Sequence, residues 1–247
     1  MADLYAVVGN PIGHTKSPLI HGAFAQQTGE GIEYVVLEAP VGGFAGRIDR
    51  FRADGGRGLN VTAPFKLDAY AYATEVQERA EQAGAANCFL FDGGRVAAEN
   101  FDGVGLARNI EANLGCPMRG RRILLLGAGG AARGAIPAFL ERGPAELVVA
   151  NRTAEKAHAL GERFSSLGNL VTAGYDALDE GRAGRFDLVV NATSASLRGE
   201  LPPVRAALFA DAALAYELAY GKGLTPFLRL AQDAGVRRLA DGVGMLV

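Results

Sequence analysis

The 247-residue chain lacks several features that would assign it to a particular class of protein. It has no tryptophan, and its two cysteines, Cys88 and Cys116, match no metal-binding or redox spacing, which indicates the reducing cytoplasm. The 25 basic residues do not outnumber the 27 acidic ones, so the basic excess of a nucleic-acid-binding protein is missing. No secretory signal opens the chain and no apolar run could span a bilayer. We therefore expect a cytoplasmic protein whose partners are neither nucleic acids nor membranes.

The chain is rich in glycine, with 34 residues, and the most informative glycines follow the apolar run at residues 122–126. That run is typical of a buried parallel strand, and the alanine-rich residues after it are typical of a helix. Gly127, Gly129 and Ala132 form the pattern G-x-G-x-x-A, in which small residues permit a tight turn and the close approach of a pyrophosphate. Backbone N–H groups at the start of the helix would bind the phosphates. We predict a nucleotide site here; the alternative is an ordinary glycine-rich turn.

Strand and helix patterns alternate along the chain, most regularly after residue 122. Repeated strand–helix units in this second part predict a doubly wound parallel sheet, so the fold class is α/β. The first hundred residues combine such units with an antiparallel hairpin. The expected elements include a strand over 4–8, a helix over 19–27 with Ser17 as N-cap, a helix over 76–83, a hairpin of strands 88–91 and 96–98, and a helix over 225–234 that begins at a capping Thr225.

The end of the next strand, Leu147–Ala150, indicates which nucleotide binds. In NAD-binding sheets this strand ends in Asp or Glu, which grips the ribose 2′-hydroxyl. Here it is followed by Asn151, Arg152 and Thr153, with Lys156 one helical turn later, so no carboxylate repels a 2′-phosphate and a guanidinium is available to bind it. We predict NADP as the cofactor; the alternative is a solvated arginine at a strand end.

Four other segments place polar residues beside predicted strands and helices. Thr15 and Ser17 lie at the start of the first helix, and Lys66 follows an apolar strand. Asn87 precedes the hairpin and Asp102 follows it. Each has an ordinary structural explanation when taken alone, as a helix cap or a turn residue.

Taken together, these segments resemble the shikimate dehydrogenase family, which includes quinate dehydrogenases. The family motifs N-P-I-x-H-S-K-S-P, N-V-T-x-P-F-K, A-G-A-x-N, N-T-D-G-x-G, G-A-G-G-A-x-R, N-R-T, N-A-T-S and D-G-x-G-M-L-V have counterparts, in this order, at residues 10–18, 60–66, 83–87, 100–105, 127–133, 151–153, 191–194 and 241–247. The resemblance covers essentially the whole chain. It implies a substrate-binding and catalytic α/β domain over 1–101, toward which 238–247 return, and a Rossmann-like NADP-binding domain over 102–237.

The resemblance also implies an activity, the reversible reduction of 3-dehydroshikimate to shikimate with NADPH in the chorismate route to aromatic amino acids. Lys66 and Asp102 correspond to the family's catalytic pair, which handles the proton of the alkoxide that hydride transfer creates. The implied substrate-binding residues are Thr15, Ser17, Thr62, Asn87 and Tyr220. The implied cofactor-binding residues are Gly127, Ala128, Gly129, Gly130 and Ala131 for the pyrophosphate, Asn151, Arg152, Thr153 and Lys156 for the adenosine phosphate, Leu218 and Gly242 for the nicotinamide, and Glu78.

The chain departs from the family pattern in three places. Thr15 replaces a serine and keeps the hydroxyl. Phe101 replaces the threonine beside the catalytic Asp102, which removes one hydroxyl from the substrate site if the ring points into it and changes little if the ring points into the core. The chain stops at Val247, where family members continue into a further helix or two.

These departures keep two alternatives open. One is a related enzyme that oxidises quinate or another shikimate-like hydroxy acid, which Phe101 favours. The other is a catalytically weak NADP-binding regulatory protein, against which the retention of Lys66 and Asp102 argues. For the assembly we expect a monomer or a homodimer, with no metal and a small molecule as substrate.

Overall fold

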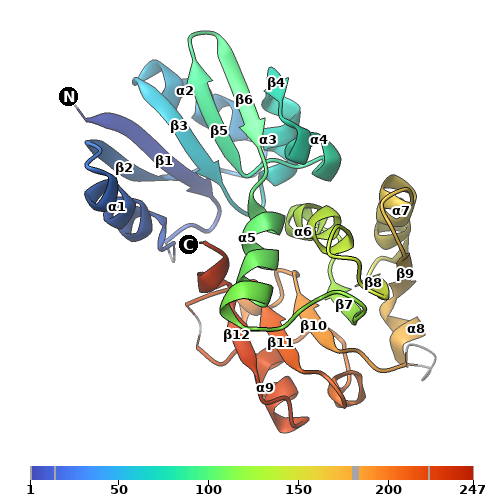
Figure 1. Cartoon of the computed structure of the whole chain (residues 1–247). Helices are drawn as coiled ribbons and strands as arrows, with labels where there is room; N and C mark the ends of the chain where they lie inside the picture. The colour runs from blue at the N-terminus through green and yellow to red at the C-terminus, as the bar shows by residue number, and fades with distance from the viewer. Residues whose placement is uncertain (1, 14, 180–183, 222, 247) are drawn as a thin grey trace. The chain divides into compact units, whose positions relative to one another are not determined.

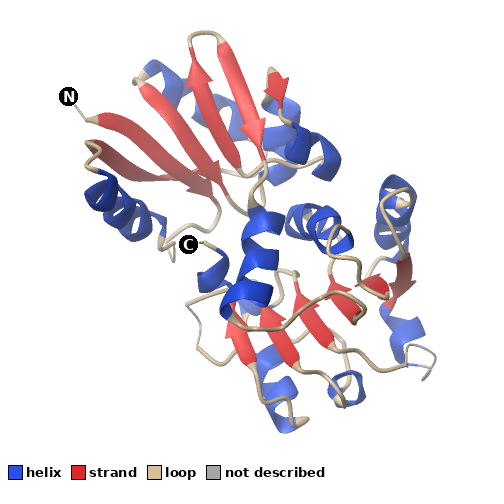
Figure 2. Ribbon diagram, viewed as in Figure 1, coloured by secondary structure: helices blue, strands red, loops and turns tan. Residues whose placement is uncertain are grey.

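The computed structural model describes residues 2–13, 15–179, 184–221 and 223–246. The chain divides into two compact units, Met1–Phe101 and Asp102–Val247. Each unit has its own six-stranded sheet. Figure 1 colours the chain from its N-terminus to its C-terminus, and Figure 2 colours it by secondary structure. Among the described residues, no helix has the length and apolar character needed to cross a membrane.

The sheet of the first unit is mixed, with strand order β2-β1-β3-β5-β6-β4. β1 pairs in parallel with β2 and β3, whereas β5 pairs antiparallel with both β3 and β6. The predicted hairpin is therefore confirmed, and Gly93 in its turn has the left-handed φ of 57° that glycine tolerates. The strands are β1 (Asp3–Gly9), β2 (Ile32–Glu38), β3 (Gly56–Val61), β4 (Glu75–Val76), β5 (Cys88–Asp92) and β6 (Arg95–Glu99).

The helices of the first unit are α1 (Ser17–Thr28), α2 (Phe44–Ala53), α3 (Lys66–Tyr72) and α4 (Glu78–Ala83). Helices α2, α3 and α4 bury apolar side chains such as Phe44, Ile48 and Ala69 in one core with the sheet. Helix α1, which buries no residue, packs against β1 and β2 (Figure 1). The expected helix over 76–83 was wrong at its start, because Val76 lies in β4 and pairs with Ala98 of β6.

The sheet of the second unit is entirely parallel, with strand order β12-β11-β10-β7-β8-β9. Starting from β7, the chain runs to β8 and β9 on one side and to β10, β11 and β12 on the other. This is the order of a doubly wound dinucleotide-binding sheet, and the predicted fold class is confirmed. The strands are β7 (Arg122–Leu126), β8 (Glu146–Asn151), β9 (Leu170–Gly174), β10 (Leu188–Asn191), β11 (Leu214–Glu217) and β12 (Leu239–Asp241).

Helices cover both faces of this parallel sheet (Figure 2). Successive residues of β7 point to opposite faces, so Ile123 and Leu125 join a core with α5, α6 and α7, while Leu124 and Leu126 join a core with α8 and α9. The helices are α5 (Asp102–Arg108), the π-helix η1 (Asn109–Asn113), α6 (Gly130–Leu140), α7 (Ala154–Phe164), α8 (Tyr175–Asp179) and α9 (Pro226–Asp233), with 3₁₀ turns η2 (Ser196–Arg198), η3 (Ala206–Phe209) and η4 (Gly242–Met245).

Candidate active site

The glycine turn connects β7 to α6 at the centre of the second sheet. Gly127 has a φ of +110°, and a side chain there would lie 3.1 Å from the Ala192 carbonyl oxygen. Gly129 is exposed, and apart from its own chain neighbours no heavy atom lies within 4 Å of the position a Cβ would take. Ala132 is fully buried in the core beneath the helix. The turn therefore leaves open space above the amino-terminal end of α6, which fits the close approach of a pyrophosphate.

The turn also lies at the point where the chain order of the sheet reverses. β7 and β10 are neighbours, and Leu126 pairs with Asn191 at their carboxyl ends. The chain leaves β7 toward one side of the sheet and enters β10 on the other, so the loops that follow these two strands diverge. Doubly wound sheets bind their ligands in the crevice at such a reversal. Gly127, Ala128, Gly129, Gly130 and Ala131 all lie there, in the turn and the first residues of α6.

The residues predicted to bind a 2′-phosphate follow the carboxyl end of β8, the strand next to β7. Asn151 ends the strand, and its side-chain amide donates to the Thr153 carbonyl at 2.9 Å. Thr153 is the N-cap of α7 but makes no side-chain cap hydrogen bond. The side chains of Arg152 and Lys156 are exposed. A basic group, a helix start and an amide thus lie within six residues, a set that fits a phosphate.

The residues predicted for the nicotinamide lie on the loop after β11 and at the end of β12. The Leu218 N–H donates to the Asn191 carbonyl at 2.9 Å, which fixes the loop to the neighbouring strand. A side chain on Gly242 would lie 2.1 Å from the Leu218 carbonyl oxygen, so only glycine allows these two backbones to approach so closely. The structure therefore brings Leu218 and Gly242 together. Tyr220 lies two residues farther along the same loop.

In the first unit, the hydroxyl groups predicted for the substrate lie at the start of α1. The Thr15 hydroxyl donates to the Ser17 hydroxyl at 3.1 Å and accepts the Ser17 N–H at 3.2 Å. The prediction of Ser17 as N-cap was wrong, because Ser17 is the first helical residue and the cap is Lys16, which makes no side-chain bond. The methyl-bearing Thr15 keeps its hydroxyl beside Ser17. His14, within the same motif, lies outside the described residues.

Backbone hydrogen bonds bring three other predicted residues into one region of the first unit. The Thr62 N–H donates to Val8 of β1, which places Thr62 at the carboxyl end of the parallel strands. The Lys66 carbonyl accepts the Ala86 N–H at 2.9 Å, beside Asn87. Thr62, Lys66 and Asn87 are all partly buried. Lys66 is the first residue of α3, a helix that the sequence did not predict.

Phe101 points neither into the core of the first unit nor into a closed pocket. It is 46% exposed, and the Arg79 guanidinium lies 4.9 Å from the centre of its ring, a cation–π contact. Its N–H donates to the Asn87 side-chain oxygen at 3.0 Å. Asp102, the next residue, begins α5 in the second unit and is only 8% exposed. Glu78 begins α4 in the first unit and is exposed, whereas the other predicted cofactor residues belong to the second unit.

Sequence reasoning missed two polar clusters. In the first unit, the His21 ring stacks on Tyr34 at 4.3 Å, and the Tyr34 hydroxyl donates to Asn60 at 2.6 Å. Burial lowers the pKa of His21, and a hydrogen bond with Asn60 opposes that shift. In the second unit, a fully buried Glu217 ends β11. Each cluster had one indication in the sequence. His21 lies four residues, about one helical turn, after Ser17, and Glu217 is a charged residue at the end of an otherwise apolar strand.

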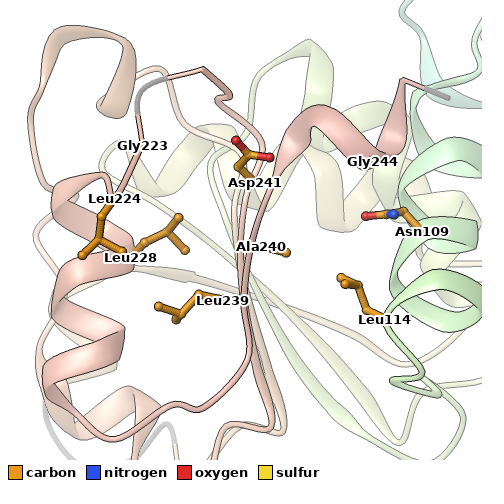
Figure 3. A pocket seen from close by; sticks show the side chains of 9 residues that line it. All are labelled: Asn109, Leu114, Gly223, Leu224, Leu228, Leu239, Ala240, Asp241 and Gly244. Carbon is orange, nitrogen blue, oxygen red and sulfur yellow. The ribbon is translucent and has the colours of Figure 1, made fainter.

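A pocket of about 470 Å³ opens in the second unit (Figure 3). None of the predicted site residues lines it, although Gly242 lies between two residues that do. Within the described part of the chain, no group of three or more His, Cys, Asp or Glu side chains could hold a metal ion. The pocket lining is mainly apolar, with Asn109 and Asp241 as its polar members and Leu114, Gly223, Leu224, Leu228, Leu239, Ala240 and Gly244 as the rest.

The doubly wound sheet, the open glycine turn and the basic strand end together define a dinucleotide-binding protein. Comparison with known proteins agrees. Family models described as the shikimate dehydrogenase substrate binding domain and as shikimate / quinate 5-dehydrogenase match residues 7–89 and 108–198. The chain therefore belongs to the shikimate dehydrogenase family, a family of oxidoreductases.

Individual relatives match nearly all of the chain. Shikimate dehydrogenase (NADP(+)) of Nitrosospira multiformis is 53% identical over 247 residues, which are 100% of this chain and 89% of that protein. A crystal structure of an Ael1 enzyme from Pseudomonas putida has 57% identity and a TM-score of 0.87, covering 99% of this chain and 89% of that one. Shikimate 5-dehydrogenase from Thermus thermophilus, solved with NADP(H) and shikimate, has 33% identity and a TM-score of 0.83, covering 99% and 88%.

Proposed function

We propose that this chain catalyses the NADP-dependent, reversible reduction of 3-dehydroshikimate to shikimate in the chorismate route to aromatic amino acids. The observation that carries the proposal is 53% identity to a shikimate dehydrogenase (NADP(+)) over the entire chain. In this proposal residues 1–101 bind the substrate and residues 102–237 bind the cofactor. The open glycine turn and the exposed Arg152 beside it support the second assignment.

The chemistry needs a hydride at the carbonyl carbon and a proton at the carbonyl oxygen. Bound NADPH supplies the hydride. The Lys66 ammonium group gives its proton to the oxygen as negative charge develops there, and takes it back in the oxidative direction. The Asp102 carboxylate orients both Lys66 and a substrate hydroxyl. Its 8% exposure supports this role, because a carboxylate shielded from water holds its partners more strongly.

The remaining polar groups bind the substrate's carboxylate and hydroxyls. The hydroxyls of Thr15 and Ser17, already in contact with each other, donate to the carboxylate with help from Tyr220. Thr62 and Asn87, together with Asp102, bind the ring hydroxyls. The backbone bonds that hold Thr62 and Asn87 in one region of the first unit support this role.

The decisive experiment is a panel of substrates and cofactors on the purified chain, with formation of NADPH followed by absorbance. We expect turnover of shikimate with NADP. Lys66→Ala should lower kcat by about 10²–10⁴-fold, the usual contribution of a general acid–base group, while calorimetry shows nearly unchanged shikimate affinity. Asp68→Asn, an exposed change in the same helix, is the matched control and should turn over normally.

Two results would contradict the proposal. Turnover of quinate but not of shikimate would instead identify a quinate-specific relative, the alternative that Phe101 favours. Binding of NADPH without turnover of either acid would indicate a regulatory protein.

A further inference from the structure

The carboxyl group of Glu217 is fully buried at the carboxyl end of β11. Four groups converge on it. One side-chain oxygen, Oε2, accepts from the Asn191 amide at 2.9 Å, from the Thr225 hydroxyl at 3.3 Å and from the Ser196 hydroxyl. The other, Oε1, accepts the Ala219 N–H at 3.2 Å. Burying a carboxyl group costs free energy unless its oxygens accept hydrogen bonds, and here both oxygens do.

Two of these partners lie at opposite ends of one loop. The loop runs from Leu218 to Leu224 between β11 and α9, with Ala219 near its start and Thr225 directly after its end. The Thr225 hydroxyl also accepts the Leu228 N–H at 3.2 Å and so caps α9. A single carboxyl group therefore ties the start of the loop to the start of the next helix.

The other partners connect this carboxyl to the glycine turn. The Asn191 side-chain oxygen accepts both the Thr193 N–H at 3.1 Å and the Thr193 hydroxyl at 2.7 Å, which fixes the orientation of the amide. The Thr193 methyl group in turn lies 3.2 Å from the position a side chain would take on Gly127. The network thus reaches from the turn after β7, through the loop after β10, to the loop after β11.

We propose that Glu217 is a positioning residue that fixes residues 218–221 of this loop, and with them the Leu218 backbone and the Tyr220 side chain, against the nicotinamide half of the bound cofactor. This inference rests on the proposed function, which assigns Leu218 to the nicotinamide and Tyr220 to the substrate carboxylate. It adds a residue that touches neither ligand.

Glutamine cannot replace Glu217 in this network. If its oxygen takes the place of Oε2, its NH₂ group faces the Ala219 N–H, and two donors oppose each other. In the reversed orientation the NH₂ group can donate to the Ser196 and Thr225 hydroxyls. It opposes the Asn191 amide, which cannot turn because Thr193 holds its oxygen. Glu217→Gln therefore loses either the Ala219 bond at the start of the loop or the Asn191 bond to the end of β10, without changing the size of the side chain.

The test measures, on the whole 247-residue chain, binding of each half of the cofactor separately. We expect Glu217→Gln to bind 2′,5′-ADP as tightly as the wild type, because Arg152 and Lys156 do not depend on this loop. NADPH should bind with a smaller change in nicotinamide fluorescence, and kcat/KM for shikimate should fall about tenfold or more, as for a lost hydrogen bond to a charged group.

The control is Glu146→Gln, the same chemical change at the opposite, amino-terminal end of the sheet. It breaks the Arg122–Glu146 ion pair, so it should lower the melting temperature while leaving nicotinamide fluorescence and kcat/KM unchanged. If Glu217→Gln does not fold, Thr225→Val releases the far end of the loop and should show the same fluorescence change.

A Glu217→Gln protein with wild-type fluorescence and kcat/KM would overturn the inference, even if it melted at a lower temperature. Equal losses of 2′,5′-ADP and NADPH affinity would also overturn it. If the wild type fails to turn over shikimate, the proposed function fails, and the fluorescence of bound NADPH still decides whether Glu217 orders the nicotinamide side.

Discussion

The contact between helices α5 and α6 should be the most sensitive packing point in the second unit. Gly103, the residue after Asp102, is buried against α6. A Cβ built on Gly103 would lie 2.0 Å from the Gly134 carbonyl oxygen and 2.9 Å from the Ala138 side chain. The obstacle is mainly backbone, so no rotation of a side chain relieves it. Gly103→Ala must therefore push the two helices apart.

The expected cost follows from two opposing terms. Alanine is favoured over glycine inside a helix by about 0.5–1 kcal/mol, whereas overpacking a close contact costs about 1–3 kcal/mol and more where backbone is involved. With a clash as short as 2.0 Å the second term wins, and we expect a net loss of about 2 kcal/mol. For a unit of this size that corresponds to a melting temperature lower by about 4–8 °C.

Calorimetry or thermal melting followed by circular dichroism measures this shift. Gly46→Ala is the matched control, since Gly46 lies inside α2 with no atom from outside its own helix backbone within 4 Å of the Cβ position, and it should be neutral or stabilising. Because Gly103 adjoins Asp102, the first variant should also turn over more slowly. A Gly103→Ala protein that melts with the wild type would refute the close helix contact.

Two further predictions concern cysteine reactivity and cofactor choice. Burial, with a smaller contribution from Glu99, raises the pKa of Cys88 to about 11, so at pH 8 roughly one thiol in a thousand is ionised, against roughly one in ten for a thiol of pKa 9.0. Alkylation of Cys88 by iodoacetamide, measured by mass spectrometry, should be about a hundredfold slower than that of a free cysteine; an equal rate would contradict the burial. Arg152→Ala should raise KM for NADP about tenfold or more, through loss of a hydrogen bond to a charged group, and KM for NAD far less. Equal effects on both cofactors would rule out the 2′-phosphate role.

The features predicted well from the sequence were those encoded within one short window. The apolar run and small residues over 122–132 define the strand, the turn and the helix locally, and β7 and α6 follow them. The hairpin is marked by the two glycines of its turn. Helix α9 is marked by its capping Thr225 and by the proline that follows it. The family, the fold class and NADP as the cofactor are confirmed by the relatives, because the motifs that carry them are local too.

The features that were missed depend on partners distant in the chain. β12 has only three residues, Leu239–Asp241, and is a strand because β11 lies beside it. Val76 was predicted to be helical, but it pairs with Ala98 of β6 and so belongs to the two-residue strand β4. The Glu217 network joins residues from 191 to 225, and no sequence window contains its donors together. The direction of the Phe101 ring depends on Arg79, twenty-two residues earlier in the sequence.

The two units have separate hydrophobic cores, and this affects how the protein unfolds on heating. The core of Phe44 and Ile48 belongs entirely to the first unit, and those of Ile123 and Leu124 entirely to the second. A ligand that binds only the folded form of a unit raises the free energy of unfolding of that unit by RT ln(1 + [L]/Kd). A nucleotide held by the second unit, at about a hundred times its Kd, therefore adds about 2.7 kcal/mol to that unit and nothing to the first. On warming with excess nucleotide, we therefore expect the melting temperature of the second unit to rise and that of the first unit, which holds the proposed substrate residues Thr15 and Lys66, to stay unchanged.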